Sequence, residues 1–250
     1  MNIGLYQSAS SLSALERWQD AVAQNITSSQ TSGYRKRTVE FSSEVAGKWN
    51  VDPEAKNGGA ENEINAVFTH ANSGINFQNG ETQPTRRELD VAIQGDGFFE
   101  VRKPDGAMAY TRSGEFRLRP DRTLVNSANL EVMTDGGNPI VLLPNGGPLN
   151  INDDGTLSQG TTVLGKLSIQ RFANLAALVP TAGDMFLATP GAGKSVVDEP
   201  EIIQGYLEQS NVQPLREMVD LVLISRAYEA NQKIITSVDQ QMQKTLDALG

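Results

Sequence analysis

The fold is decided by residues 214–249, PLREMVDLVLISRAYEANQKIITSVDQQMQKTLDAL. Nine positions here repeat at alternating spacings of three and four residues, and seven of the nine are apolar: Leu221, Ile224, Tyr228, Asn231, Ile235, Val238, Met242, Thr245 and Leu249. Such heptad spacing is typical of a helix that buries one stripe against other helices. Pro214 falls in the first turn, where no backbone N–H is needed, so the pattern predicts one helix over about 212–248.

The N-terminal end carries a matching but weaker stripe. Its positions, five of them apolar, are Leu5, Ser8, Leu12, Leu15, Gln19, Val22 and Ile26. They predict a helix over about 5–28, ended by the polar run 27–33. An isolated amphipathic helix is marginal in water, so the two terminal helices should pack together and leave part of each stripe for other subunits. The predicted seam is Leu5, Leu12, Leu15, Val22, Ile26, Leu221, Ile224, Tyr228, Asn231, Ile235, Val238, Met242 and Leu249.

Asn231 is a lone polar residue within this stripe. A buried polar residue in a heptad can fix the register between helices at some cost in stability. The side chain could equally face solvent or bond to a backbone carbonyl. Both interpretations stay open on the sequence alone.

Between the helices the pattern changes to period two. Apolar residues alternate with polar ones around Val91 and Ile93 and again at Phe116 and Leu118, with turn signals every 8 to 12 residues. Short strands at this spacing predict an all-β, sandwich- or barrel-like domain. The fold class is therefore α+β: a discontinuous helical coiled-coil domain from both termini and an all-β middle. The predicted domains are a helix in 1–33, an irregular arm or linker in 34–81, the β domain in 82–207 and a helix in 208–250.

Composition excludes several classes of function. The chain has no Cys and one His, which removes Cys-ligated zinc, iron–sulfur clusters, disulfides and multi-His metal sites. Its 30 acidic and 21 basic residues give a net charge of −9, whereas a nucleic-acid binder needs a basic surface. No apolar run approaches the roughly 20 residues of a membrane span, and the N-terminus does not read as a cleaved secretory signal. We expect no cofactor, metal, nucleic-acid partner or small-molecule substrate.

Three motifs suggest chemistry but have simpler interpretations. Gly193-Lys194-Ser195 lacks the glycine five residues earlier that a phosphate loop requires, so a surface loop is favoured. The run 150–155 resembles the start of a calcium loop, but Thr161 stands at the bidentate Glu position, which favours a hairpin turn. Asp90 and Asp96 could form a carboxylate pair for glycoside hydrolysis. That reading keeps a carbohydrate-binding or carbohydrate-active module as the alternative function.

The one dense basic run is Tyr34, Arg35, Lys36 and Arg37. It could be a solvated face of the arm. It could also be a docking arm for an acidic surface of a neighbouring subunit, since the rest of the chain is acidic.

Three blocks of sequence resemble the rod and hook proteins of the bacterial flagellum. The first is NITSSQTSGYR at 25–35, similar to the family pattern N-L-A-N-x-x-T-x-G-[FY]-[KR]. The second is LDVAIQGDGFF at 89–99 followed by YTRSGEF at 110–116. The third is LEQSNV at 207–212 with MVDL at 218–221 and RAYEANQK at 226–233. The resemblance covers both ends and the middle, and is strongest to basal-body rod proteins, the proximal (FlgF) type first and the distal (FlgG) type second.

This resemblance implies a non-enzymatic structural subunit of the flagellar rod. Such proteins are exported unfolded by the flagellar type III apparatus without signal cleavage and assemble helically with copies of themselves and with other rod and hook proteins. Their terminal helices form an inner coiled tube, and the rod transmits torque from motor to hook. The expected location is the basal body, across the periplasm where an outer membrane is present. The first block departs from the pattern at Thr27, Ser28 and Gln30. The third block leans toward distal-rod proteins, whereas length and the divergent N-terminus favour a proximal one.

Overall fold

The computed structural model describes residues 3–50, 63–181 and 183–247 of the chain. Their packing divides the chain into two compact units, each discontinuous in sequence. Unit 1 contains residues 1–26, 37–74 and 213–250, and unit 2 contains residues 27–36 and 75–212. The chain therefore passes from one unit to the other four times.

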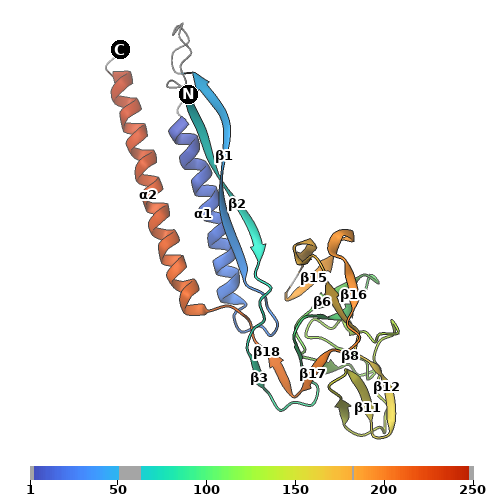
Figure 1. The fold of residues 1–250 in the computed structure, drawn as a ribbon. Coiled ribbons are helices and arrows are strands. Elements are labelled where there is room, and N and C mark those ends of the chain that lie inside the picture. The colour runs from blue at the N-terminus through green and yellow to red at the C-terminus, as the bar shows by residue number, and fades with distance from the viewer. Residues whose placement is uncertain (1–2, 51–62, 182, 248–250) are drawn as a thin grey trace. The chain divides into compact units, whose positions relative to one another are not determined.

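Unit 1 combines both terminal helices with a two-stranded ribbon. Helix α1 (Ile3–Thr27) and helix α2 (Pro214–Asp247) run antiparallel, and α1 lies between α2 and the paired strands β1 (Arg37–Asn50) and β2 (Glu63–Ile75) (Figure 1). Both helices form where the heptad stripes predict them. Helix α2 begins at Pro214, whose fixed φ and missing N–H suit a first helical position. Neither helix, over its described residues, has an apolar stretch of the length and hydropathy that a bilayer crossing requires.

The structure differs from the sequence expectation over 34–81. Where an irregular arm is expected, residues 37–50 and 63–75 form two long strands. Contacts with α1 support them: the Trp18 ring meets Phe41 edge-on at 5.6 Å, and Arg17 Nη1 donates to the Ala71 carbonyl at 3.0 Å. A helix contributed from elsewhere in the sequence thus stabilises a ribbon that would be marginal by itself.

Unit 2 is mainly β. Its largest sheet has nine strands, along the path β14-β15-β6-β5-β9-β8-β7, with β13 joining β5 to β16. Separate sheets are formed by β10-β11-β12, by β17 with β4, and by β18 with β3. The strands are β3 (Thr82–Pro84), β4 (Val91–Gln94), β5 (Phe98–Arg102), β6 (Met108–Thr111), β7 (Arg117–Leu118), β8 (Leu124–Val125), β9 (Glu131–Val132), β10 (Leu149–Ile151), β11 (Thr156–Gln159), β12 (Thr162–Lys166), β13 (Ile169–Phe172), β14 (Leu178–Pro180), β15 (Met185–Ala188), β16 (Lys194–Val196), β17 (Glu201–Gln204) and β18 (Tyr206–Glu208); 3₁₀ turns η2 (Leu175–Ala177) and η3 (Pro190–Ala192) complete it.

Two apolar clusters hold unit 2 together. The larger is centred on Phe99 and Phe116, both fully buried and packed edge-to-face at 5.1 Å. The smaller is largely aromatic, and in it the Phe98 ring contacts both Phe172 and Phe186. Edge-to-face aromatic pairs each add about 0.5–1.5 kcal/mol beyond area burial. The chain thus contains a mainly β middle flanked in sequence by helices.

Candidate functional site

Among the described residues, the two helices of unit 1 share one small buried apolar cluster. Leu15 and Val22 of α1 and Ile224 of α2 are buried together, with Trp18, Ile26 and Ala227 packed around them. This contact involves only the C-terminal half of α1 and the start of α2. It holds the pair together but covers a small part of the stripe on α2.

The predicted seam residues fall into three groups. Leu15, Val22 and Ile224 are buried in the helix pair. The half-buried members are Leu5, Leu12, Ile26, Tyr228, Asn231, Ile235 and Val238. Leu221 and Met242 are exposed, and Leu249 lies outside the described residues.

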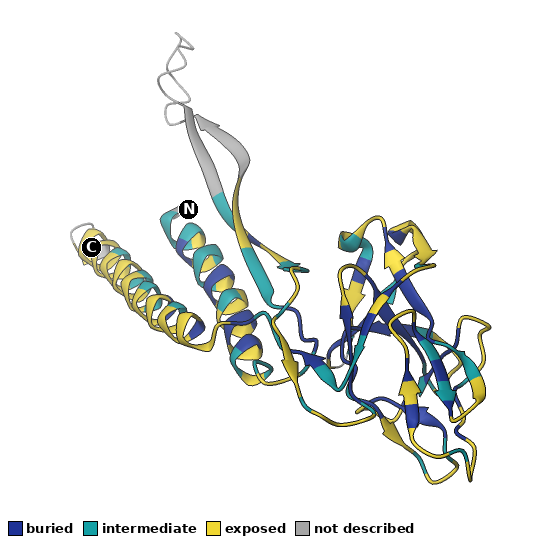
Figure 2. Cartoon of the chain, turned by 60° about the horizontal axis from the view of Figure 1, so that its bottom comes forward, coloured by how far each residue is buried: buried dark blue, intermediate teal, exposed yellow. Residues whose placement is uncertain are grey.

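Most of α2 is left uncovered by the part of the chain that the structure describes. No described side chain from Ser225 to Asp247 is buried (Figure 2). Asn231 Nδ2 donates to the Ala227 carbonyl one turn earlier at 3.0 Å, so its amide bonds its own helix. The heptad stripe on α2 is therefore largely unused by the folded monomer.

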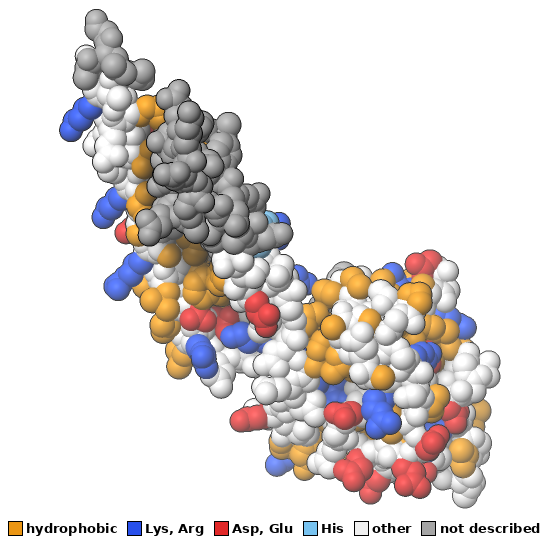
Figure 3. Space-filling model, turned by 45° about the horizontal axis from the view of Figure 1, so that its top comes forward, with side chains coloured by type: hydrophobic (Ala, Val, Ile, Leu, Met, Phe, Trp, Pro, Cys, Tyr) orange, Lys and Arg blue, Asp and Glu red, His pale blue; other side chains and the backbone are white. Residues whose placement is uncertain are grey.

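The first turns of α2 expose apolar residues that the heptad analysis missed. Leu215 is 80% exposed, and Met218, Val219, Val222 and Leu223 are each about half exposed. In Figure 3 apolar side chains likewise gather along the helical part of the molecule. The sequence signal was present in the unbroken run Leu221 to Ile224, which puts apolar side chains on more than one face of a helix. Residues of this run, with Tyr228, line a groove of about 570 Å³ whose α1 side is lined by Glu16 and Gln19.

A polar junction inside unit 1 ties the end of α1 to the start of α2. Asn25 and Glu217 are both buried, and Asn25 Nδ2 donates to Glu217 Oε2 at 2.9 Å. The same amide pairs with the first residue of β1, donating to the Arg37 carbonyl at 2.9 Å and accepting from its N–H at 2.8 Å. The Asn25 side chain thus links the last turn of α1 to the first residue of β1.

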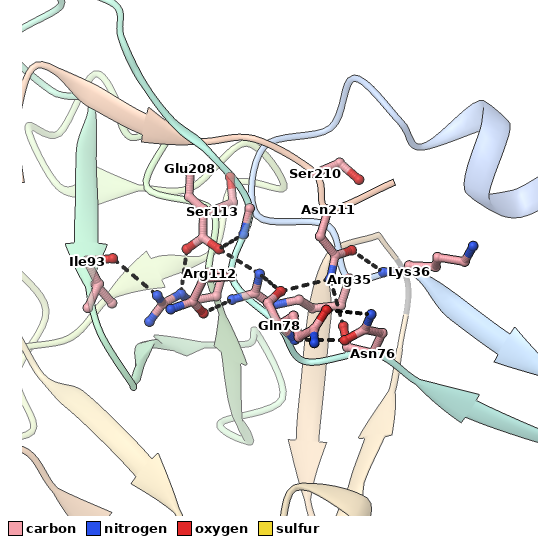
Figure 4. Close-up of polar contacts among 12 residues, drawn as sticks. Arg35, Lys36, Asn76, Gln78, Ile93, Arg112, Ser113, Glu208, Ser210 and Asn211 are labelled. Carbon is pink, nitrogen blue, oxygen red and sulfur yellow. Dashed lines mark hydrogen bonds and ion pairs between the residues drawn. The ribbon is translucent and has the colours of Figure 1, made fainter. Parts of the chain in front are cut away.

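A second junction lies wholly inside unit 2 and is centred on Glu208 (Figure 4). Its Oε1 accepts from Arg35 Nη1 at 2.6 Å and from the Gly80 N–H at 2.8 Å, and its Oε2 accepts from Arg112 Nε at 2.7 Å. All three charged side chains are at most 2% exposed. The junction therefore gathers segment 27–36, residues 75–81 and the end of β18, which are the parts of unit 2 nearest in sequence to its chain crossings.

The docking-arm residues are distributed unevenly. Tyr34 and Arg35 are buried in unit 2, and Lys36 and Arg37 are half-buried. The Lys36 N–H donates to Asn211 Oδ1 at 2.7 Å. Burial lowers the pKa of Arg35 below its usual value and the nearby Arg112 charge lowers it further, while Glu208 opposes both effects. Arg35, Arg112 and Glu208 come one from each block of the resemblance, and no motif in the sequence predicts that they meet.

The other motifs are structural where the structure describes them. Residues 149–159 form the β10–β11 hairpin, which confirms the turn interpretation of 150–155. Lys194 begins β16 and pairs with Glu100 at 2.6 Å. Of the two carboxylates considered as a pair, Asp90 is fully buried, with its Oδ1 3.5 Å from Arg87 Nε, whereas Asp96 is exposed. No group of three or more His, Cys, Asp or Glu that could hold a metal occurs among the described residues.

Two protein-family models match this chain. Residues 92–159 match the flagellar hook protein FlgE/F/G D1 domain, and residues 203–248 match the C-terminal domain of the flagellar basal body rod FlgEFG proteins. The second match covers the end of unit 2 and nearly all of α2. It therefore includes both Glu208 and the exposed stripe.

Relatives along the full length agree with these models. The chain is 31% identical to the basal-body rod protein FlgF of Caulobacter vibrioides over 252 residues, covering 100% of this chain and 99% of that protein. It is 31% identical to FlgG of Borreliella burgdorferi, covering 95% of each, and 28% identical to FlgF of Mesorhizobium japonicum, covering 100% and 99%. The carbohydrate alternative finds no support among these matches. Because relatives of 31% identity cover 95–100% of its length and both family models match it, the chain belongs to the flagellar basal-body rod protein family of the FlgF/FlgG type.

Proposed function

We propose that this protein is a non-enzymatic subunit of the flagellar basal-body rod that assembles helically through its terminal helices. The observation that carries the proposal is the unused apolar surface of α2. Full burial of a side chain such as Leu215, Val219 or Ile235 contributes about 1.5–3 kcal/mol of favourable free energy. In the monomer these side chains are exposed or half-buried, so much of that free energy remains available for assembly. Helices from other subunits in coiled-coil contact would cover this surface.

Its partners in this proposal are copies of itself and other rod and hook proteins, reached through the flagellar type III export apparatus. The relatives' own names place them in the basal-body rod. We assign the protein to the proximal, FlgF-type position because FlgF relatives align over the whole chain. In the assembled rod the subunit would pass torque from the motor toward the hook.

The decisive test places one charge in the seam. Ile235→Asp should reduce incorporation into basal bodies and polymerisation of purified protein about tenfold or more. The reason is that a buried unpaired carboxylate costs several kcal/mol, and about 1.4 kcal/mol is a factor of ten. Gln232→Asp adds the same charge at an exposed polar position of the same helix and is the matched control.

Three measurements read this test: sedimentation of polymers, immunoblots of isolated basal bodies and swimming in soft agar. Circular dichroism of each variant monitors the fold of unit 2. Normal incorporation of Ile235→Asp, at the level of Gln232→Asp, would overturn assembly through α2.

A further inference from the structure

A small cavity of about 100 Å³ opens beside the Glu208 junction, within unit 2. Its charged lining is Arg35, Arg112, Arg171 and Asp96, and its apolar walls include Phe98 and Phe172. At about 30 Å³ per water, the space holds roughly three waters, or the carboxylate end of one acidic side chain.

The guanidinium groups at this cavity have donors to spare. Arg35 uses Nη1 for Gln78 and Glu208 and Nη2 for Asn79, and its buried Nε has no partner. A guanidinium carries five N–H donors in a fixed fork, so two of those on Arg35 are unused. Arg171 at the cavity is exposed, and its guanidinium makes no hydrogen bond or ion pair with any described residue.

Arg112 is close to saturated by comparison. Its Nε donates to Glu208 at 2.7 Å, Nη1 to the Gly97 carbonyl at 2.5 Å, and Nη2 to the carbonyls of Ile93 and Gly95. It supplies positive charge and one remaining donor rather than a fully open fork.

The charges at the cavity do not balance. Glu208 is the one buried carboxylate between two buried guanidiniums, and Arg171 adds a third positive charge against the exposed Asp96. An incompletely compensated charge of low solvent exposure is costly, and a carboxylate that accepts from spare N–H donors removes that cost.

We propose that this cavity binds the carboxylate of an acidic side chain from a second copy of this chain, with Arg171 at its mouth. The identity of the donor rests on the proposed assembly. Residues 51–200 hold most of the acidity, since the first fifty residues carry five basic and four acidic side chains and the last fifty carry four and seven. The methylenes of an entering Glu would contact Phe98 and Phe172, and its oxygens would accept from Arg171 and Arg35.

Binding is tested on the full-length protein with glutarate as the probe and neutral glutaramide as its isostere. Titrations follow the arginine Nε–Hε signals by NMR. Arg171→Gln should weaken glutarate binding about tenfold, as loss of a charge-assisted hydrogen bond does. Asp96→Asn removes the negative charge at the cavity and should tighten binding about two- to threefold. Arg117→Gln, an exposed arginine that does not line the cavity, should change nothing.

Assembly of the same variants tests the source of the carboxylate. Arg171→Gln should raise the concentration needed for polymerisation, and Arg117→Gln should not. Glutarate binding without an assembly defect, or equal binding of glutaramide, would overturn the proposal while leaving helix-driven assembly standing. If Ile235→Asp also polymerises normally, the proposed function itself fails, so the two failures are distinguishable.

Discussion

Glu208 accepts hydrogen bonds from both Arg35 and Arg112, and the first of these partners lies 173 residues away in sequence. Asn25 and Glu217 form a comparable buried pair 192 residues apart. In the sequence these residues fall in or beside the blocks that resemble a known family. A residue in such a block, Arg35 for example, can be interpreted as a contact with a neighbouring subunit. The structure instead gives them partners inside their own unit.

Removing the Glu208 charge measures how much the junction contributes to the stability of unit 2. Glu208→Gln leaves two buried guanidiniums without their carboxylate, and breaking a buried ion pair costs about 3–5 kcal/mol. We therefore expect the free energy of unfolding of unit 2 to fall by that amount. Urea titrations that follow the near-ultraviolet signal of its aromatic cluster measure the change.

The control for this substitution is Glu115→Gln. Glu115 pairs with Arg87 at 3.2 Å, but both side chains are about half exposed, so the expected cost is at most about 1 kcal/mol. Equal effects of the two substitutions would show that burial of the junction contributes nothing.

Among the elements, the turn after α1 is constrained more tightly than its polar sequence indicates. Gly33 has φ +71° and its N–H donates to the Glu208 carbonyl at 2.8 Å. A Cβ at this position would lie 2.3 Å from the Ser113 N and 2.5 Å from the Arg112 carbonyl carbon. The backbone at Gly33 therefore packs directly on the backbone of Arg112 and Ser113, beside the junction.

Gly33→Ala is expected to destabilise unit 2 through both strain and overlap. Gly137 supplies the matched control, because its φ of +75° imposes similar backbone strain while an added Cβ meets nothing within 4 Å. Gly137→Ala should cost about 1–2 kcal/mol and Gly33→Ala at least twice that, measured by thermal and urea unfolding. Equal costs would mean that the close approach relaxes freely.

Period-two alternation does not predict the burial of every strand residue correctly. Phe116 and Leu118 share the inward phase of one alternating run, yet Phe116 is fully buried and Leu118 is 40% exposed. Leu118 lies on β7, the last strand of the sheet path in the described part of the chain. Conversely Ala92, in the outward phase of β4, is completely buried.

At the scale of the whole molecule, two units are built from five stretches of one chain. Unit 2 has two apolar clusters, the larger of them extensive, whereas the helix pair of unit 1 buries a cluster of only three described residues beside the Asn25 junction. Regions with few buried apolar contacts open most readily, so the stability of the monomer should be uneven along the chain.

Hydrogen exchange on a confirmed monomer should expose this difference. Amides of 229–247 should exchange fastest, those of α1 and the start of α2 more slowly, and those of β5 and β6 in unit 2 slowest. Polymerisation should then protect 229–247 by at least about a hundredfold, as apolar faces are buried on assembly. Protection of 229–247 in the monomer equal to that of β5 would contradict an assembly role for this surface.

The sequence by itself determined the two helices, the mainly β middle and the family, because heptad and period-two patterns are local and α1 and α2 follow them to within two residues. The sandwich- or barrel-like character of the middle and the seam residues stay predictions. Tertiary structure alone decided that 37–50 and 63–75 form strands, that Arg35 is buried, and that a cavity with spare guanidinium donors opens beside Glu208. These features depend on which distant segments bury one another's charges and polar groups, and no spacing along the chain encodes that.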